Sequence, residues 1–222
     1  MTGGFNFRYN LTMHTPHIHD SDVAIIKQWL GTGSLNIFGR PFAGKDTQGR
    51  MLAELFGGVE ISGGEILRSH HDPAQIEAII AQGGIIPSDF YLSMVLPYLS
   101  RPEIAQKPLI LSTVGRVLNE AEVILPATSQ AGHPMKAVID LHISDADVWQ
   151  RLEASQHSHD RGERSDDHRE VLQNRLHEYQ SKTVPVIDFY EQKGLLIRID
   201  GTQSREAVEQ AILDALVDRA RQ

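Results

Sequence analysis

The sequence predicts an α/β fold in which a parallel β-sheet is covered by helices on both faces. Short apolar runs typical of buried strands alternate along the chain with segments whose apolar residues recur at helical spacing. The first of these runs leads into a glycine-bounded turn and a lysine. A length of 222 residues, with 41% hydrophobic and 23% charged residues, suits one globular domain.

The stretch Leu35–Leu55 carries the strongest signal. The apolar run at Leu35–Phe38 predicts a buried strand, and GRPFAGK at Gly39–Lys45 fits the spacing G-x-x-x-x-G-K. From Asp46 onward, apolar residues return at helical spacing. A strand, a glycine-bounded loop, a lysine and a helix in this order predict a phosphate-binding loop, and the context disfavours the alternative of a chance glycine-rich turn.

Simple electrostatics explains why such a loop binds anions. The backbone N–H groups of the loop and of the helix N-terminus present partial positive charge to a phosphate. Gly39 and Gly44 allow backbone angles and a close approach that a Cβ would block. Lys45 can reach a β- or γ-phosphate.

Residues 1–34 are predicted to form an N-terminal extension with one short helix, of which the polar segment Met1–Pro16 is expected to be loosely attached. Asp20 or Ser21 is the expected cap of this helix, which runs to Leu30. The extension also contains three histidines, which can be interpreted as a metal site. Because they lack acidic or cysteine partners, we favour an incidental cluster; they are His14, His17 and His19.

The remaining pattern alternates strands and helices. Further strands are predicted at Val59–Ser62, Pro108–Ser112, Ala137–Ile143 and Leu195–Asp200. Helices are predicted at Ser62–His70, around Ile76–Ile80, and at Phe90–Leu99, Ala146–Leu152, Glu170–Lys193 and Ala207–Ala220. Ser144 or Asp145 can cap the helix that begins at Ala146. Pro185 should kink or interrupt the long helix at Glu170–Lys193.

Composition excludes several classes of function. A net charge of -8 argues against nucleic acid as the main partner. The absence of cysteine removes disulfides, thiolate catalysis and thiolate metal sites. The first residues lack the apolar core of a signal peptide, and no apolar run is long enough to span a bilayer. We therefore expect a cytoplasmic protein without a membrane anchor.

Several arginines are placed to meet an anionic ligand. Arg116 follows the carboxyl end of the strand Pro108–Ser112, where ligands gather in open α/β sheets. The polar stretch Ser155–Asp167 predicts an exposed loop and holds Arg161 and Arg164. For each arginine alone, a solvated surface charge is the simpler interpretation.

Together these segments resemble adenylate kinase and the related nucleoside monophosphate kinases, over roughly Leu35–Ala220. GRPFAGKDTQ resembles the family's loop GxPGxGKGTQ, SGGEILR resembles STGDLLR, and LILSTVGR resembles FLLDGFPR. The block that starts at RSDDHREVLQNRLHEYQ and ends at IDGT resembles RxDD…RLxxY…PLIxYY…G…VDGT. The resemblance implies a fold like that of the P-loop NTPases, with MgATP on the loop and a nucleoside monophosphate in a second pocket.

The resemblance also implies roles for individual residues. Lys45 would hold the β- and γ-phosphates, and the catalytic set would be Lys45, Arg116, Arg151, Arg164 and Arg175. ATP would contact Gly39, Arg40, Pro41, Phe42, Ala43, Gly44, Lys45, Asp46, Thr47, Arg151 and Gln203. The monophosphate would contact Gly63, Arg68, Ile86, Gly115, Arg116, Glu120, Arg164 and Arg175. Asp166 and Asp167 would order the lid arginines.

The implied organisation is a kinase domain at residues 35–222, in which residues 62–100 bind the monophosphate and residues 153–168 form a short lid. Ser155 stands where the family often has another arginine, and Arg161 is the candidate replacement. Without cysteines, the lid cannot carry a zinc site of thiolates. Closure should exclude water from the transferring phosphoryl group. The family habit implies a monomer.

Two departures concern the metal. The family's FLLDGFPR carries an aspartate that helps to hold Mg²⁺, whereas Ser112 stands at that position. Asp46 replaces a glycine beside Lys45, and Phe42 also stands where the family has glycine. One hypothesis is that Asp46 supplies the carboxylate missing from the second strand. The opposite hypothesis is that Asp46 repels the triphosphate, which would give a weakened or inactive nucleotide-binding relative.

The choice of acceptor base is also open. Gly63 replaces a threonine, and Glu120 stands where adenylate kinases usually have a glutamine that contacts adenine. An ionised glutamate accepts hydrogen bonds but donates none, so it suits the amino group of adenine or cytosine and the N–H pair of guanine. Asn119 adds a donor. AMP is the first expectation, with GMP, CMP, UMP or a small metabolite as alternatives.

Overall fold

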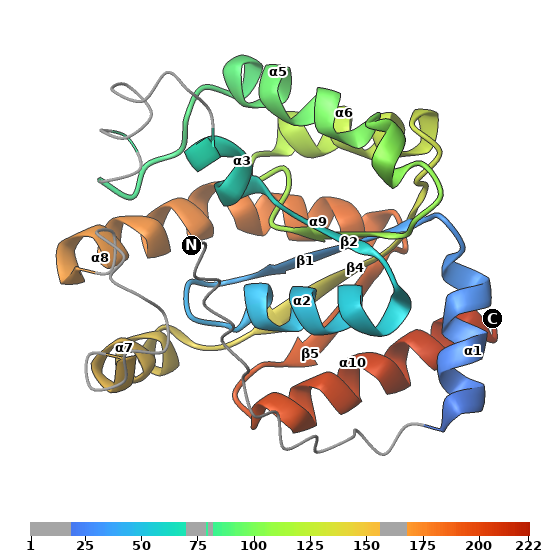
Figure 1. Cartoon of the computed structure of the whole chain (residues 1–222). Helices are drawn as coiled ribbons and strands as arrows, with labels where there is room; N and C mark the ends of the chain where they lie inside the picture. The colour runs from blue at the N-terminus through green and yellow to red at the C-terminus, as the bar shows by residue number, and fades with distance from the viewer. Residues whose placement is uncertain (1–18, 70–78, 80–81, 156–167) are drawn as a thin grey trace, which may run out of the picture.

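The chain folds around a five-stranded sheet whose strands are all parallel, in the order β2-β3-β1-β4-β5. The computed structural model describes residues 19–69, 79, 82–155 and 168–222, without the side chains of Glu65, Arg68 and Ser69. The strands are β1 Ser34–Gly39, β2 Val59–Ser62, β3 Leu109–Ser112, β4 Met135–His142 and β5 Leu196–Asp200. This confirms the predicted parallel sheet with helices on both faces (Figure 1).

The helices connect successive strands and cover the sheet. They are α1 Asp20–Leu30, α2 Lys45–Phe56, α3 Gly63–Ser69, α5 Ser88–Leu99, α6 Leu118–Gln130, α7 Asp145–Ser155, α8 Arg169–Glu178, α9 Val184–Gln192 and α10 Arg205–Ala220. A short 3₁₀ segment, η1, spans Pro102–Ile104, and a π-helical segment, η3, spans Tyr179–Thr183. Within the described ranges, no helix is long and apolar enough to cross a bilayer.

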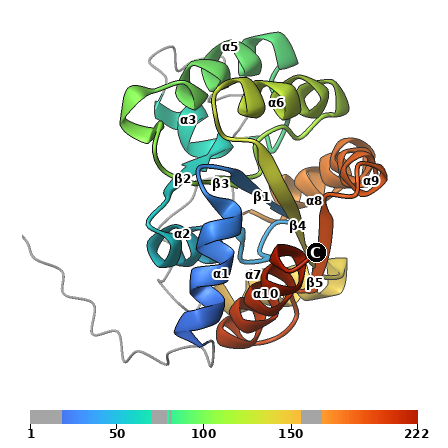
Figure 2. The ribbon, with the colours of Figure 1, turned by 90° about the vertical axis from the view of Figure 1, so that its right-hand side faces the viewer.

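Each face of the sheet has its own apolar core, because neighbouring residues of a strand point in opposite directions. Ile37 of β1 packs with α1, α2 and α10, whereas the adjacent Phe38 packs with α5, α6 and α9. The same alternation separates Ile139 from Val138 on β4. Figure 2 shows α5 and α6 on one side of the sheet and α1, α2 and α10 on the other.

The helix α1 is part of the packed structure. Its residues Ile26 and Leu30 are buried in the same core as α10. An ion pair of 2.7 Å between Asp22 and Arg221 joins its start to the end of the chain. The residue at the N-cap position is His19, without a side-chain capping bond, so the expected cap at Asp20 or Ser21 was wrong.

The predicted long helix at Glu170–Lys193 divides into three parts. The helix α8 ends at Glu178, η3 follows, and α9 begins at Val184 with Pro185 in its first turn. A proline there loses no helical hydrogen bond, because the first N–H groups of a helix have no partner within it. The expected interruption near Pro185 is therefore confirmed, and it takes the form of a π-helical turn.

The helix α6 was not predicted from the sequence. Its buried residues Ala121, Ile124 and Thr128 follow helical spacing, but Pro126 lies inside the helix and hides the pattern. The predicted helix cap at Ser144 is present, because the Asp147 N–H donates to Ser144 Oγ at 3.2 Å. Asp147 in turn accepts from the Ser144 N–H at 2.8 Å, which completes a reciprocal cap of α7.

Parallel pairing brings the carboxyl ends of the three central strands to one edge. Ile37 of β1 pairs with Ser112 at the end of β3, and Gly39 pairs with Leu141 near the end of β4. The loop before α2 lies at this edge, as do α7 and α8 (Figure 1). The sequence-predicted strands therefore converge where ligands bind in folds of this class.

Asn36 fastens the loop after β3 to the centre of the sheet. Its fully buried side chain donates to the Val114 carbonyl oxygen at 2.8 Å and accepts from the Val114 N–H at 3.3 Å. We expect Asn36→Leu to lower the free energy of unfolding by about 2–5 kcal/mol, because it leaves both backbone groups of Val114 buried without partners. Denaturant unfolding measures the change.

The exposed Gln150 on α7 gives the control. Gln150→Leu makes a comparable polar-to-apolar change at the surface and should alter the free energy of unfolding by less than about 0.5 kcal/mol. A loss below about 1 kcal/mol for Asn36→Leu would contradict the anchoring role of this side chain.

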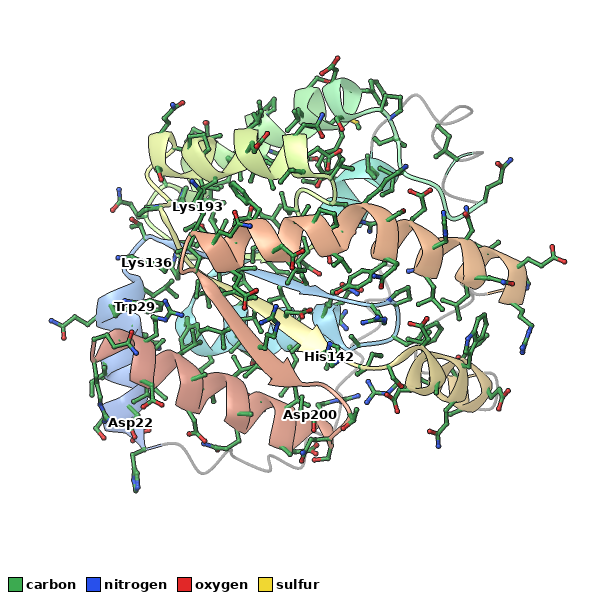
Figure 3. All side chains as sticks on the ribbon, turned by 180° about the vertical axis from the view of Figure 1, so that it is seen from behind. Asp22, Trp29, Lys136, His142, Lys193 and Asp200 are labelled. Atoms are coloured by element: carbon green, nitrogen blue, oxygen red, sulfur yellow. The ribbon has the colours of Figure 1, made fainter. Side chains whose placement is uncertain are left out.

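The turn between β5 and α10 is organised by Asp200. Its Oδ1 accepts from the Thr202 hydroxyl at 2.6 Å and from the Thr202 N–H at 2.9 Å, and its Oδ2 accepts from Gln203 at 3.1 Å. Figure 3 shows Asp200 at the end of β5, next to the end of β4, where His142 is its register partner. The hydrogen bonds from Thr202 lower the pKa of Asp200 from 3.8 to about 2.

This lowered pKa predicts a specific acid response. Between about 2 and 3.8 the unfolded chain binds more protons than the folded one, so the stabilisation by Asp200 is complete above this window and is lost as the pH falls through it. The difference in unfolding free energy between wild type and Asp200→Asn should shrink below about pH 4. Thr202→Val should reduce the same pH-dependent part. A difference that stays constant from pH 6 to pH 3 would contradict the assignment.

Candidate active site

The loop between β1 and α2 requires glycine at two positions. Gly39 has φ +148°, and a Cβ there would lie 2.6 Å from the Leu141 carbonyl oxygen on β4. Gly44 has φ +94° and directly precedes the first residue of α2, Lys45. The close approach to β4 and the left-handed turn into α2 explain why these glycines bound the loop.

Lys45 lies inside the curve of the loop. Its Nζ donates to the carbonyl oxygens of Gly39 at 2.9 Å and Arg40 at 2.8 Å. These bonds hold the ammonium group beside the N-terminus of α2, which is the positive end of the helix dipole. A cation and oriented N–H groups at one place form an anion site.

A cavity that opens to solvent adjoins this loop, and its empty space, open solvent included, is about 1010 Å³. At one end it is lined by Phe42, Lys45 and Asp46, and it extends past Gly63 to Tyr91. Its complete lining is Pro41, Phe42, Lys45, Asp46, Ser62, Gly63, Gly64, Leu67, Gly83, Gly84, Ile85, Ile86, Tyr91, Ser112, Thr113, Arg116, Glu120 and Arg175.

Three cations mark the place where this cavity meets a second one. Lys45, Arg116 and Arg175 line both cavities, although they come from α2, the loop after β3 and α8. The second cavity extends toward Glu178 and Tyr179. A cluster of three cations between two cavities suits a phosphate chain that reaches into both.

Among the residues that the structure describes, two other than glycine adopt left-handed backbone angles, and both line the larger cavity. They are Phe42, with φ +65°, and Thr113, with φ +53°. Such angles cost about 1 kcal/mol or more for a residue with a side chain, and a β-branched threonine is an unusual case. In the family motifs quoted above, both positions carry glycine. Strain of this kind is concentrated at functional sites.

Asp46 and Ser112 are in direct contact. The Ser112 hydroxyl donates to Asp46 Oδ1 at 2.9 Å and joins the first turn of α2 to the end of β3. The two positions that depart from the family motifs therefore lie side by side. Both residues also line the larger cavity.

Two hydrogen bonds hold the backbone of Arg116 in place. Its N–H donates to Glu120 Oε2 at 2.8 Å, and its carbonyl oxygen accepts from the Thr183 hydroxyl at 3.2 Å. Thr183 is the last residue of η3, so the π-helical turn contacts the loop that carries Arg116. π-helical turns are frequent at functional sites for this kind of local adjustment.

Both carboxylate oxygens of Glu120 have partners within the protein. Oε2 accepts from the N–H groups of Arg116 and Val117, and Oε1 accepts from the Ser88 hydroxyl at 3.0 Å. Burial raises the pKa of Glu120, and these hydrogen bonds oppose the rise. Glu120 therefore acts first as the cap of α6. Its predicted contact with an acceptor base stays a prediction.

Arg151 and Arg40 stabilise the rim of the loop. Arg151 on α7 donates to the Phe42 carbonyl oxygen at 3.0 Å and to the Gly201 carbonyl oxygen at 2.6 Å. Arg40 pairs with Asp145 at 2.7 Å, and its guanidinium lies 5.2 Å from the ring centroid of Tyr179. Gln203, which was predicted to contact ATP, donates a hydrogen bond to Asp200 at the same rim.

The helix α8 brings Arg175 to the cavity. Asn174 donates to the Gln82 carbonyl oxygen at 2.6 Å, and a Cβ at Gly83 would lie 2.9 Å from Arg175 Cγ. The loop before α5 and the arginine-bearing part of α8 therefore pack directly against each other. Residues on both sides of this contact, Gly83 and Arg175, belong to the lining of the larger cavity.

The other residues predicted to contact a nucleotide lie at different places in the fold. Pro41, Gly63 and Ile86 line the cavity, while Ala43 is buried in the core beneath the loop. Gly115 has φ +82° and precedes Arg116. Thr47 lies in the first turn of α2. The described residues exclude the side chain of Arg68 and all of Arg164, Asp166 and Asp167, so their predicted roles stay predictions.

Sequence reasoning did not nominate several residues of the cavity lining, among them Tyr91 and Thr113. The signal for Thr113 was available, since it stands where the family motif has glycine. The sequence held no such signal for Tyr91, because its relation to Gly63 exists only in the folded structure. A Cβ at Gly63 would lie 2.7 Å from the Tyr91 hydroxyl oxygen, so this hydroxyl fills the space that a side chain at position 63 would need.

Comparison with known proteins agrees with this geometry. The family model described as adenylate kinase matches residues 37–195. An adenylate kinase of Parvibaculum lavamentivorans is 31% identical over 179 residues, which cover 78% of this chain and 87% of the relative. Adenylate kinases of Xylella fastidiosa strain 9a5c (31%) and Xanthomonas oryzae pv. oryzae strain MAFF 311018 (32%) match over 187 residues, covering 82% of this chain and 98% of each relative. The chain belongs to the adenylate kinase family of nucleoside monophosphate kinases.

Proposed function

We propose that this protein transfers the terminal phosphoryl group of MgATP to AMP and so forms two molecules of ADP. The observation that carries the proposal is the cluster of Lys45, Arg116 and Arg175 where the two cavities meet. Membership of the family supports the reaction class, and the names of the relatives support AMP as the acceptor.

The proposed mechanism is mainly one of positioning and charge neutralisation. Phosphoryl transfer spreads negative charge over the oxygens of the migrating group and requires the two reacting oxygens to be in line. Lys45 would hold the donor phosphates beside the N-terminus of α2. Arg116 and Arg175 would bind phosphate oxygens bidentately and keep the acceptor in register.

The lid residues would complete the reaction site. Arg164 and Arg151 would approach the transferring group, and Asp166 and Asp167 would order the lid arginines. Arg151 already contacts the loop through the Phe42 carbonyl oxygen, which supports a place at the donor side. Exclusion of water on closure would prevent hydrolysis of ATP.

The residues around Asp46 fit a magnesium ion. Mg²⁺ is usually held by one or two carboxylates together with substrate phosphates and water. Asp46 supplies one carboxylate next to the phosphate-binding lysine, and the Ser112 hydroxyl orients it. The described part of the chain contains no cluster of three or more acidic, histidine or cysteine side chains that could hold a metal alone. Bound between Asp46 and the nucleotide, the ion would neutralise phosphate charge.

The second candidate is a nucleotide-binding relative without transferase activity. It is favoured by the carboxylate of Asp46 beside the phosphate site and by the backbone strain at Phe42. Without a cation between them, a carboxylate and a triphosphate repel each other strongly. A third candidate, a kinase for another monophosphate or a small metabolite, follows from Gly63 and Glu120.

A coupled assay with MgATP and AMP, GMP, CMP, UMP and dTMP in parallel tests the function. We expect turnover with AMP, and we expect Lys45→Met to reduce kcat by more than about a hundredfold because it removes the cation nearest the donor phosphates. Turnover with another monophosphate alone would replace AMP as the acceptor. ATP binding without turnover for any acceptor would favour the second candidate.

The magnesium hypothesis predicts a shift in metal requirement. Asp46→Asn should raise the Mg²⁺ concentration for half-maximal rate by roughly tenfold or more, because an amide replaces the carboxylate that faces the ion. The reciprocal double variant Asp46→Gly with Ser112→Asp should move the carboxylate to β3 and restore the wild-type requirement. The measurement is initial rate against free Mg²⁺ at fixed ATP.

Ser112→Ala is the matched control, because it removes the hydroxyl and keeps the carboxylate. Its magnesium requirement should stay within about threefold of wild type, as expected for the loss of one neutral hydrogen bond. An unchanged requirement in Asp46→Asn would contradict the hypothesis. A higher rate in that variant would instead support repulsion between Asp46 and the triphosphate.

A further inference from the structure

The side chain of Tyr91 fills the space that a side chain at position 63 would need. A Cβ built on Gly63 would lie 2.7 Å from the Tyr91 hydroxyl oxygen and 2.9 Å from the Thr113 carbonyl oxygen. Both distances are too short for carbon and oxygen in van der Waals contact. A polar group is therefore present at this point of the cavity, and it comes from α5 rather than from the start of α3.

The phenol is held in a defined position. Its ring is buried, with 4% of its surface exposed, and its oxygen accepts from the Gly115 N–H at 3.2 Å. Burial raises the pKa of Tyr91 to about 12, so the hydroxyl keeps its proton at physiological pH. A phenol that accepts one hydrogen bond from the backbone still has a proton to donate.

The surroundings of Tyr91 suit the nucleoside rather than the phosphate of an acceptor. The three cations shared by the two cavities lie at their junction, whereas Tyr91, Gly63 and Leu67 line only the larger cavity. Leu67 and the buried Ile86 supply apolar surface there, with Tyr91 and Glu120 as polar groups. Apolar walls with a few fixed polar groups are typical of sites for planar rings.

We propose that the Tyr91 hydroxyl contributes to recognition of the acceptor by donating a hydrogen bond to a ring nitrogen of the adenine base of AMP. Gly63 lacks a side chain because the hydroxyl occupies its place. This inference rests on the proposed function for the identity of the ligand, since it requires a nucleoside monophosphate in the larger cavity.

Tyr91→Phe tests the hydrogen bond. Loss of one donor should weaken AMP binding about five- to tenfold, measured both as Kd by titration calorimetry and as KM, with kcat within about twofold and KM for ATP unchanged. Tyr98→Phe, on the same helix but outside the cavity lining, is the control and should leave Kd and KM for AMP unchanged. Equal Kd values for wild type and Tyr91→Phe would overturn the inference.

Analogues of AMP identify the accepting atom. The 1-deaza, 3-deaza and 7-deaza forms each replace one ring nitrogen with carbon. We expect one of them to bind wild type about five- to tenfold more weakly than AMP and to bind Tyr91→Phe as well as AMP does, because the hydrogen bond can be lost only once. Additive losses for all three analogues would overturn a contact with a ring nitrogen of adenine.

A second pair of variants tests the shared space without depending on the ligand atom. Gly63→Ala should weaken AMP binding at least tenfold in the wild-type background. In the Tyr91→Phe background the same change should cost less, because the oxygen 2.7 Å away is gone. Thermal unfolding of each variant separates local effects from loss of the fold. Equal costs in both backgrounds would contradict the spatial coupling.

The outcomes separate this inference from the proposed function. Binding of AMP without turnover would overturn the kinase proposal and still allow the Kd comparison for Tyr91. Turnover with an unchanged acceptor Kd in Tyr91→Phe would support the kinase and overturn the role of Tyr91. If wild type neither binds nor turns over any of the monophosphates, both proposals are wrong.

Discussion

The parallel pairing of β1 with β3 on one side and β4 on the other is the constraint on which the site depends. It puts the ends of three strands at one edge, so that Gly39 at the end of β1 is packed against Leu141 and the first turn of α2 is joined to Ser112 through Asp46. The apolar cores on both faces fix the register, because a shift by one residue would exchange Ile37 with Phe38. Placement of the phosphate-binding residues therefore follows from burial of the strands.

The site keeps the phosphate-binding lysine and the arginines of its family motifs. It differs from these motifs where serine replaces the aspartate of the β3 motif and aspartate replaces the glycine after Lys45. A serine stands at the end of β3 and a carboxylate stands in the first turn of α2, and the two side chains share a hydrogen bond. Beside them, Phe42 and Thr113 hold left-handed backbone angles at positions where the family motifs have glycine. Across the cavity, the Tyr91 hydroxyl fills the space that a side chain at Gly63 would need. Because these residues are in contact, the effects of changing them are expected to be coupled rather than additive.

Much of this structure could be predicted from the sequence, because its determinants are local. The apolar run at Leu35–Phe38, the glycines that bound the loop and the position of Pro185 each act within a few residues. The missed features depend on distant partners. Glu120 is a helix cap because Ser88 and the backbone of Arg116 surround it, and α6 was hidden by Pro126.

The same division applies inside the candidate site. The resemblance to family motifs was enough to nominate Lys45, Arg116 and Arg175, which line the junction of the cavities. Tyr91 could not be nominated, because its relation to Gly63 exists only after α3 and α5 have packed against the loop that follows β3. Fixed spacing along the chain reports local geometry, whereas such pairs appear only in three dimensions.

The measurement that tests the central claim most directly is a crystal structure with Mg²⁺ and a bisubstrate analogue in which five phosphates join two adenosines. We expect the phosphate chain to pass Lys45, Arg116 and Arg175, the metal to lie against Asp46, and one adenine to lie beside Tyr91. A metal held away from Asp46, or a phosphate chain that avoids the junction of the two cavities, would contradict the proposed site.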